Sequence, residues 1–324
     1  MKGLRITGKI LLNILVILIV AALLLHLGVT AIYFDYFLHS KGEFVVPGLD
    51  AAFVHQGFDY IGEEDTYLIS GYMSDDTAAR VYVRRGDGYT YYVNLLRPDG
   101  TAYVEHAGGV CHNGDFLYVA GPNGVDVFSL AEVLAGHDST QLGTVTTGYE
   151  MAYCSFYNGY LLTGDFYYPG TYETPADHRF TTPAGDANMA LMAVFKADES
   201  APFGISPTPV AAISTPGRVQ GVCFNADQLI LSTSYGFNTS YLKAYRFDEA
   251  RQGTATVADA QVPLYYLDSA NLTDTVAAPP MSEELLFKDG RVWVLNESAS
   301  NKYIYGKFIR GYQVFAYEME GDRD

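Results

Sequence analysis

The sequence predicts an all-β domain that follows a single membrane-spanning helix. The run from Ile10 to Phe34 is apolar and contains no Asp, Glu, Lys or Arg. Beyond it, no stretch keeps the 3.6-residue apolar period of an amphipathic helix. Short apolar runs such as 116–119 and 291–295 are bounded by Gly, Asn and Asp, as strands are. The same short pattern returns along the chain, which is typical of a domain built from repeats.

The apolar run is long enough to cross a membrane, because roughly 20 helical residues span a hydrocarbon core of about 30 Å. Lys2, Arg5 and Lys9 precede the run, whereas Asp35 follows it, so the positive-inside rule keeps the N-terminus in the cytoplasm. We therefore expect a single-pass plasma-membrane protein. Its parts are a cytoplasmic segment at 1–9, a span in the lipid bilayer at 10–34, a juxtamembrane linker at 35–42 and an extracellular domain at 43–324.

A cleaved secretory signal is the alternative reading of the same run, because Val29, Thr30 and Ala31 are small enough for a cleavage site. The run exceeds the roughly 7 to 15 residues of a usual signal core, and bulky Ile32 and Tyr33 follow at once, which favours an uncleaved anchor. The domain is exported in either case. The aromatic residues at 33, 34, 36 and 37 fit a belt at the outer interface.

Composition narrows the class of the exported part. About 290 residues remain, enough for one large β domain, and no Pro/Gly/Ser linker or charge run divides them. All 37 acidic residues lie there with 17 of the 20 basic ones, which gives a net charge of −20. This charge argues against a nucleic-acid partner and favours solubility in an external medium. Three Cys leave at least one unpaired, so a disulfide-stapled scaffold is excluded.

The repeat is clearest between two segments that align without a gap, His106–Val119 and Arg218–Leu231. Weaker echoes begin at 56, 150 and 282. Each echo opens with a short polar or Gly entry, runs into a strand, turns at an Asn, Asp or Gly pair, and continues into a second apolar strand.

Further strands complete each unit. We expect a third strand in every unit, at 79–83, 124–130, 189–197, 241–247 and 312–317. A fourth strand fits in the first four units, at 89–95, 141–147, 208–213 and 261–267. The fifth unit runs out of chain before its fourth strand, and the unclaimed strand at 43–46 is a candidate to pair there.

Four-stranded units repeated in this way resemble a β-propeller over nearly all of residues 43–319. The units number about five, and the strand at 43–46 would close the ring. A six-bladed ring of the NHL and SMP-30 type stays open, because the third unit, 150–219, is long enough for an extra pair of strands. An irregular β-sandwich is the other alternative. The resemblance implies an architecture and no particular activity, because propellers host many functions.

The propeller resemblance also implies where a site would lie. In propellers of this strand order, the entry to each first strand and the loop between second and third strands open on the same end of the channel. The longest irregular stretch, 165–183, is then a candidate lid over this mouth. The entries supply Gln56, His106, Glu150, Gln220, Glu283 and Glu284, and the loops supply Tyr72, Asp165, Tyr167, Tyr235, Glu297 and Lys302.

Two functions fit a mouth lined by carboxylates, amides and tyrosines. The first is a cell-surface binding or scaffold module for a small polar ligand, glycan or protein, with ligand-binding residues Gln56, Tyr72, Asp165, Tyr167, Gln220, Tyr235, Glu297 and Lys302. The second is an extracytoplasmic metal-assisted hydrolase or lactonase-like enzyme, with catalytic candidates His106, Glu150, Glu283 and Glu284. Glu150 and Glu283 are also the candidates to hold Ca²⁺. A third interpretation is structural: polar residues also line the solvated mouth of a water-filled channel in proteins that have no activity there.

Two further patterns bear on chemistry. Cys111, Cys154 and Cys223 occupy equivalent places in three successive units, where we expect small buried residues too far apart for disulfides. The chain contains no P-loop, no Gly-x-Ser-x-Gly elbow and no His-Glu-x-x-His motif. The sequence therefore lacks the motifs that usually indicate a nucleotide-binding protein, a serine hydrolase or a zincin.

Overall fold

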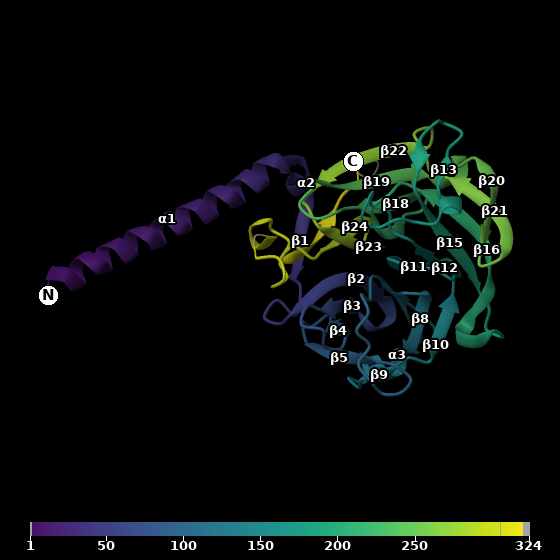
Figure 1. The fold of residues 1–324 in the computed structure, drawn as a ribbon, viewed down its shortest axis with the longest axis horizontal. Coiled ribbons are helices and arrows are strands. Elements are labelled where there is room, and N and C mark those ends of the chain that lie inside the picture. The colour runs from purple at the N-terminus through teal and green to yellow at the C-terminus, as the bar shows by residue number, and fades with distance from the viewer. Residues whose placement is uncertain (1, 305, 320–324) are drawn as a thin grey trace.

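A computed structural model describes residues 2–304 and 306–319 of the chain. Met1 of the predicted cytoplasmic segment and residues 320–324 of the predicted extracellular domain lie outside the described residues. Helix α1, Lys2–Ile32, runs away from a ring of β-sheets (Figure 1). Its segment Lys9–Ile32 is long and apolar enough to cross a membrane, which fits either an anchor or a signal sequence.

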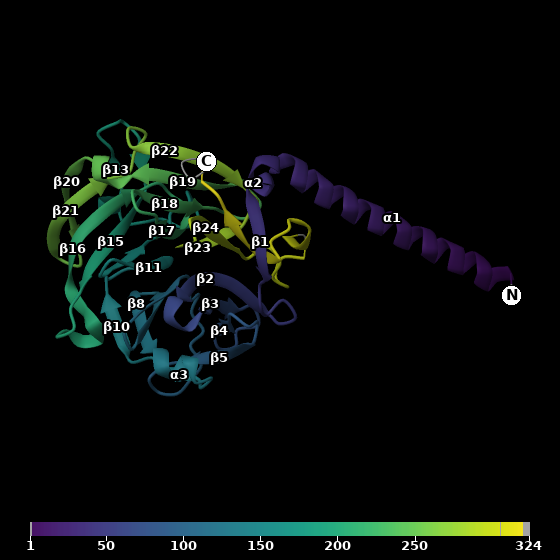
Figure 2. The same ribbon diagram turned by 180° about the vertical axis from the view of Figure 1, so that it is seen from behind.

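The sheets form the five blades of a β-propeller around a central channel, as predicted (Figure 2). Blade 1 contains β2 (Phe53–Ile61), β3 (Thr66–Met73), β4 (Arg80–Arg85) and β5 (Thr90–Leu96), edged by β9 (Ser139–Thr140). Blade 2 contains β6 (Val110–Asn113), β7 (Phe116–Gly121), β8 (Gly124–Ser129) and β10 (Gly143–Thr146), with the short helix α3 (Leu130–Leu134) after β8. Blade 4 contains β17 (Val219–Phe224), β18 (Gln228–Thr233), β19 (Ser240–Arg246) and β22 (Leu272–Ala278). Blade 5 contains β23 (Ser282–Lys288), β24 (Arg291–Asn296), β25 (Gln313–Tyr317) and β1 (Ser40–Val45).

Blade 3 departs from the four-stranded plan. Its strands β11 (Tyr153–Tyr157), β12 (Tyr160–Gly164), β15 (Ala190–Ala197) and β16 (Ile205–Thr215) are joined by a hairpin of β20 (Gln252–Val257) and β21 (Ala260–Tyr266). Strand β21 pairs in parallel with β16, with Leu264 opposite Ala212. The prediction of 261–267 as the fourth strand of the fourth unit was therefore wrong. The chain leaves blade 4 after β19, extends blade 3, and returns as β22.

The third unit holds no sixth blade. Its long connection contains only the two-residue strands β13 (Phe180–Thr181) and β14 (Ala187–Asn188), which pair with each other. The six-bladed and sandwich alternatives are thus wrong for the described chain, and the five-bladed prediction is confirmed.

The ring closes between the two ends of the domain. Strand β1 pairs antiparallel with β25, with Val45 opposite Gln313 and Ser40 opposite Tyr317. The predicted pairing of strand 43–46 with the fifth unit is confirmed. Because the first strand of the domain completes the last blade, the two ends of the domain are held together in one sheet, and only short edge strands remain at the outside of the blades.

Neighbouring blades touch backbone to backbone at the channel, and glycines make this approach feasible. A Cβ atom on Gly109 would lie 2.3 Å from the backbone nitrogen of Cys154, and one on Gly57 would lie 2.4 Å from that of Val110. All three cysteines are buried and free, as predicted. The Sγ atoms of Cys111 and Cys154 nevertheless lie 3.7 Å apart across this contact, closer than equal heights in separate blades led us to expect.

Packed aromatic side chains join helix α1 to the ring. Residues 35–42, predicted as a linker, instead form most of helix α2 (Phe34–Leu38) and the start of β1. Tyr36 is 1% exposed and stacks on Tyr317 with ring centroids 5.3 Å apart, and the Tyr33 hydroxyl lies 3.1 Å from Thr239 Oγ1. These two tyrosines therefore face the propeller and not a lipid belt, whereas Phe34 remains exposed.

Candidate functional site

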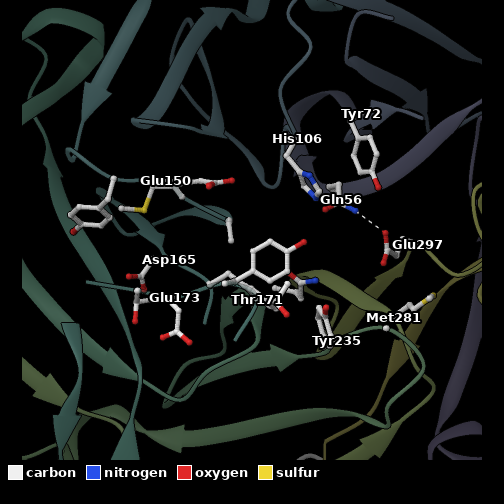
Figure 3. A pocket seen from close by; sticks show the side chains of 18 of the residues that line it. Gln56, Tyr72, His106, Glu150, Asp165, Thr171, Glu173, Tyr235, Met281 and Glu297 are labelled. Carbon is white, nitrogen blue, oxygen red and sulfur yellow. Dashed lines mark hydrogen bonds between the residues drawn. The ribbon is translucent and has the colours of Figure 1, made fainter. Parts of the chain in front are cut away.

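The channel mouth contains a cavity of about 670 Å³ to which all five blades contribute (Figure 3). The predicted mouth residues that line it are Gln56, Tyr72, His106, Glu150, Asp165, Gln220, Tyr235, Glu297 and Lys302. It is also lined by Tyr149, Met151, Ala152, Phe166, Thr171, Tyr172, Glu173, Thr174, Pro175, Gly236, Met281 and Tyr303, which were not among the candidate site residues. The structure leaves Tyr167, Glu283 and Glu284 out of the lining.

Three inner strands carry the same irregularity at the mouth. Their pairing registers shift between His55 and Phe58 in β2, between Val219 and Gly221 in β17, and between Ser282 and Leu285 in β23. Such bulges add a residue that is not paired in the ladder and redirect its side chain, and they are frequent next to functional sites. Gln56, Gln220, Glu283 and Glu284 lie in these three shifts, so local backbone irregularity decides which of them reach the cavity.

One side of the mouth is built by blades 1, 2 and 5 and carries a positive charge. Lys302 Nζ donates a hydrogen bond to the Tyr72 hydroxyl and lies 4.7 Å from the centre of that ring. The His106 ring packs against Tyr72, with its centroid 4.5 Å from that of the tyrosine ring. Although His106 still meets solvent in the cavity, loss of surrounding water and the Lys302 ammonium lower its pKa. His106 is thus an uncharged group beside a lysine.

Glu297 is a buried carboxyl group on the same side of the mouth. It is 8% exposed and accepts a hydrogen bond of 3.1 Å from Gln56 Nε2. Burial raises the pKa of Glu297 to about 7, even though the Tyr303 hydroxyl and the Lys302 ammonium oppose the shift. Lys302 donates its hydrogen bond to Tyr72 and forms no ion pair with Glu297.

Glu283 and Glu284 lie beneath the cavity and are each 1% exposed. Gln220 Nε2 donates to Glu283 Oε1 at 3.3 Å, while Glu284 Oε1 accepts from the backbone nitrogens of Val222 at 2.9 Å and Leu285 at 3.2 Å. Burial raises the pKa of both carboxyl groups well above the usual range. Glu284 therefore links the inner strands of blades 4 and 5.

The opposite side of the mouth, from blades 3 and 4, is aromatic and acidic. Tyr168 stacks on Tyr235 with ring centroids 3.7 Å apart, and Phe166 and Tyr172 each lie within 6.2 Å of the Tyr235 ring. The Glu150 carboxylate lines the same cavity and has no hydrogen bond or ion pair with any described residue. An open carboxylate in a cavity that also holds aromatic faces is free to meet a ligand.

The connection between β12 and β15, which is the candidate lid, supplies much of this wall. Buried His178 Nδ1 lies 2.6 Å from Asp165 Oδ2, and Asp165 Oδ1 accepts from the Leu191 nitrogen at 2.7 Å. Asp165 therefore pins the connection across the mouth and has little capacity left for a ligand. Tyr167 points elsewhere, against Gly217 and under the Arg179 guanidinium 5.1 Å away.

Comparison with known proteins leaves the activity open. No family model matches the chain. No curated protein matches it either. Among solved structures, a gluconolactonase from Xanthomonas campestris is 12% identical with a TM-score of 0.41, over 87% of this chain and 86% of that one. A calcium-binding regucalcin from Agrobacterium tumefaciens is 10% identical with a TM-score of 0.41, over 85% and 93%. Likeness at this level transfers no ligand or reaction.

The part of the chain that the structure describes contains no preformed cluster of metal ligands. Among those residues, no three or more His, Cys, Asp or Glu side chains are grouped so that they could hold an ion. The two metal candidates are separated by the floor of the cavity, because Glu150 lines it and Glu283 is buried below. What the arrangement supplies is hydrogen bonding from both sides, aromatic faces on one side, and one lysine.

Proposed function

We propose that this protein is a single-pass membrane protein whose propeller binds a small polar ligand, glycan or protein group at the outer face of the plasma membrane. The N-terminus lies in the cytoplasm, because Lys9 precedes the apolar segment and Asp35 follows it. Support for an uncleaved anchor comes from the junction. Thr30, in the last turn of the apolar segment, accepts a side-chain hydrogen bond from Arg310 of the propeller. A cleaved signal would have no reason to bond with the folded domain.

The observation that carries the binding proposal is the cavity itself. Its volume of about 670 Å³ falls within the roughly 300 to 1,000 Å³ of small-molecule sites. The aromatic cluster of Phe166, Tyr172 and Tyr235 offers flat apolar faces, and the open Glu150 carboxylate offers an acceptor. These groups suit a ligand with both a CH-rich or cationic face and hydrogen-bond donors, such as a sugar or an amine.

A binding screen tests this proposal. The full chain in detergent is scanned by thermal shift and ligand-detected NMR against neutral sugars, primary and quaternary amines, small carboxylates, and calcium with and without EDTA. For a compound that binds, we expect Tyr235→Ala and Glu150→Gln each to weaken affinity about tenfold, since one stacking or charge-assisted contact contributes about 1 kcal/mol or more.

Matched exposed positions outside the cavity lining provide the controls for this screen. Tyr160→Ala, at the start of β12, and Glu199→Gln, after β15, should leave the affinity unchanged. The proposal is wrong if no compound binds, or if binding survives both cavity variants at full strength. A midpoint that moves with calcium and returns with EDTA would add a cation to the site.

A hydrolase remains the second candidate, and Glu297 is the observation that favours it. A carboxyl group with a pKa of about 7 at the edge of a cavity is matched to general acid–base catalysis at neutral pH. His106 and Glu150 line the same cavity, whereas Glu283 and Glu284 do not. The same panel, extended to esters, lactones and glycosides and read as turnover, separates the two candidates: only an enzyme loses activity in Glu297→Gln.

A further inference from the structure

The connection between β24 and β25, residues 297–312, links the mouth of the propeller to the membrane helix. At one end, Glu297, Lys302 and Tyr303 line the cavity. At the other end, the short 3₁₀ turn Gly306–Phe308 packs against α1, and Figure 1 shows this connection beside the end of α1 next to β1. We call residues 304 and 306–310 the juxtamembrane turn.

Two contacts fix the juxtamembrane turn at the depth where α1 ends. Arg310 Nη1 donates to Thr30 Oγ1 at 3.1 Å, and the Arg310 guanidinium lies 4.1 Å from the centre of the Phe37 ring. Thr30 belongs to the last turn of the apolar segment Lys9–Ile32. If that segment crosses the bilayer, a side chain bonded to Thr30 stands at the membrane interface, where arginine favours the headgroup region.

The juxtamembrane turn presents apolar side chains to solvent. Ile304 is 66% exposed and Phe308 is 37% exposed, whereas Ile309 is buried. The turn is not loose: the Gly306 nitrogen donates to the Tyr303 oxygen and the Ile309 nitrogen to the Gly306 oxygen, each at 2.9 Å. Lys307 Nζ adds bonds to the Ala299 oxygen and to Asn301 Oδ1.

We infer that the juxtamembrane turn is a second membrane contact, which inserts Ile304 and Phe308 into the outer headgroup region beside α1. Single exposed apolar residues are ordinary on protein surfaces. Here they lie next to Lys307 and Arg310 and beside the end of the apolar helix, and apolar side chains flanked by basic ones are the pattern of interfacial segments. The occupant is the lipid bilayer, because the apolar surface of α1 continues into the turn. This inference rests on the proposed anchor.

A membrane-seated turn has a consequence for the mouth. Helix α1 leaves the ring sideways at its rim in both views, beside blade 5 (Figures 1 and 2). With the turn seated as well, the rim of blade 5 faces the lipid. Lys302 and Tyr303, which directly precede the turn, then hold the mouth close to the membrane surface.

Lipid-depth quenching of single labelled cysteines tests the inference on the full chain in nanodiscs. The native cysteines are buried, so an introduced exposed thiol is the one that reacts. Ile304→Cys and Phe308→Cys probe the turn, Leu18→Cys probes the middle of α1, and exposed Val210→Cys on β16 of blade 3 is the control. Each carries an environment-sensitive fluorophore, and the quencher is a spin label placed shallow or deep on the lipid chain.

We expect the shallow quencher to lower emission from positions 304 and 308 by about twofold or more, since interfacial segments bury about 5 to 10 Å into the headgroup boundary. The deep quencher should act on position 18, and neither on position 210. If position 18 is quenched while 304 and 308 behave as position 210 does, the inference is overturned and the anchor stands. If position 18 is not quenched, both the membrane contact of the turn and the proposed anchor are wrong. The Trp293 emission of each variant shows whether the propeller has folded.

Discussion

Replacing Gly109 with alanine is expected to destabilise the propeller strongly. The new Cβ would lie 2.3 Å from the Cys154 nitrogen and 2.8 Å from the Tyr153 Cα, and both are backbone atoms of the inner strand of blade 3. A side chain could rotate away, but a hydrogen-bonded strand cannot. Overpacking costs roughly 1 to 3 kcal/mol even where side chains can adjust, so we expect at least about 3 kcal/mol here. The melting temperature, followed by Trp293 fluorescence, should fall by about 10 °C.

A glycine with open space provides the control for that variant. At Gly62 the nearest atom to a new Cβ is Tyr60 Cε1 at 3.7 Å, an ordinary contact, so Gly62→Ala should melt close to the natural chain. Equal midpoints for Gly109→Ala and Gly62→Ala would mean that blades 2 and 3 do not touch at the channel. The packing of inner strands that forms the mouth would then be wrong.

The second large effect is a pH dependence set by Glu297. Burial gives this carboxyl a pKa of about 7 in the folded protein, against 4.5 ordinarily. As pH rises above 4.5, the unfolded chain releases a proton that the folded chain keeps, so the contribution of Glu297 to stability falls until pH passes about 7. The loss integrates to on the order of 3 kcal/mol. Glu297→Gln cannot titrate, so it should gain stability relative to the natural chain between pH 5 and pH 8.

Comparing the two chains at each pH removes the other titrating groups from the result. Burial lowers the pKa of His55 to about 4, so His55 makes the protein more stable as pH rises toward 6.5. This contribution is opposite in sign to that of Glu297, and it is the same in both chains. Melting temperatures are recorded in matched buffers at pH 5 and pH 8, with the exposed Glu199→Gln as control. The melting temperature of Glu297→Gln minus that of the natural chain should be larger at pH 8 than at pH 5. A difference that is equal at the two pH values, or smaller at pH 8, would contradict the raised pKa of Glu297.

Much of the fold could be predicted from the sequence, because the same sequence pattern recurs in each blade. Polar entry, apolar strand, turn and apolar strand recur, and the pairing of 43–46 follows from a missing fourth strand. The misassigned strand at 261–267 shows the limit. A strand that adds to a neighbouring blade in parallel buries Val262 and Leu264 on alternate positions, as a fourth strand of its own blade would. Nothing local distinguishes the two.

The site was predictable at the level of the mouth and not of the single side chain. Nine of the predicted residues line one cavity, because inner-strand entries and second-to-third loops meet there. Within irregular backbone the direction of a side chain has no period. Phe166 therefore faces the cavity where Tyr167 was expected, and the register shift in β23 turns Glu283 and Glu284 beneath it. Only the length of the β12–β15 connection signalled that it would form a wall.

The account depends most on closure of the ring, because only a closed ring brings the five entries to one mouth. Val45 and Gln313 are opposite one another in the β1–β25 pair, at the Cα separation of about 4.5 to 5.5 Å that a disulfide can bridge. In the double variant Val45→Cys, Gln313→Cys, mild oxidation should join these positions in the folded protein, as mapped by mass spectrometry of an unreduced digest. Val45→Cys with Asp289→Cys, in the β23–β24 turn, is the mismatched control. Cross-linking of 45 to 313 no faster than of 45 to 289 would contradict the closed propeller and its common mouth.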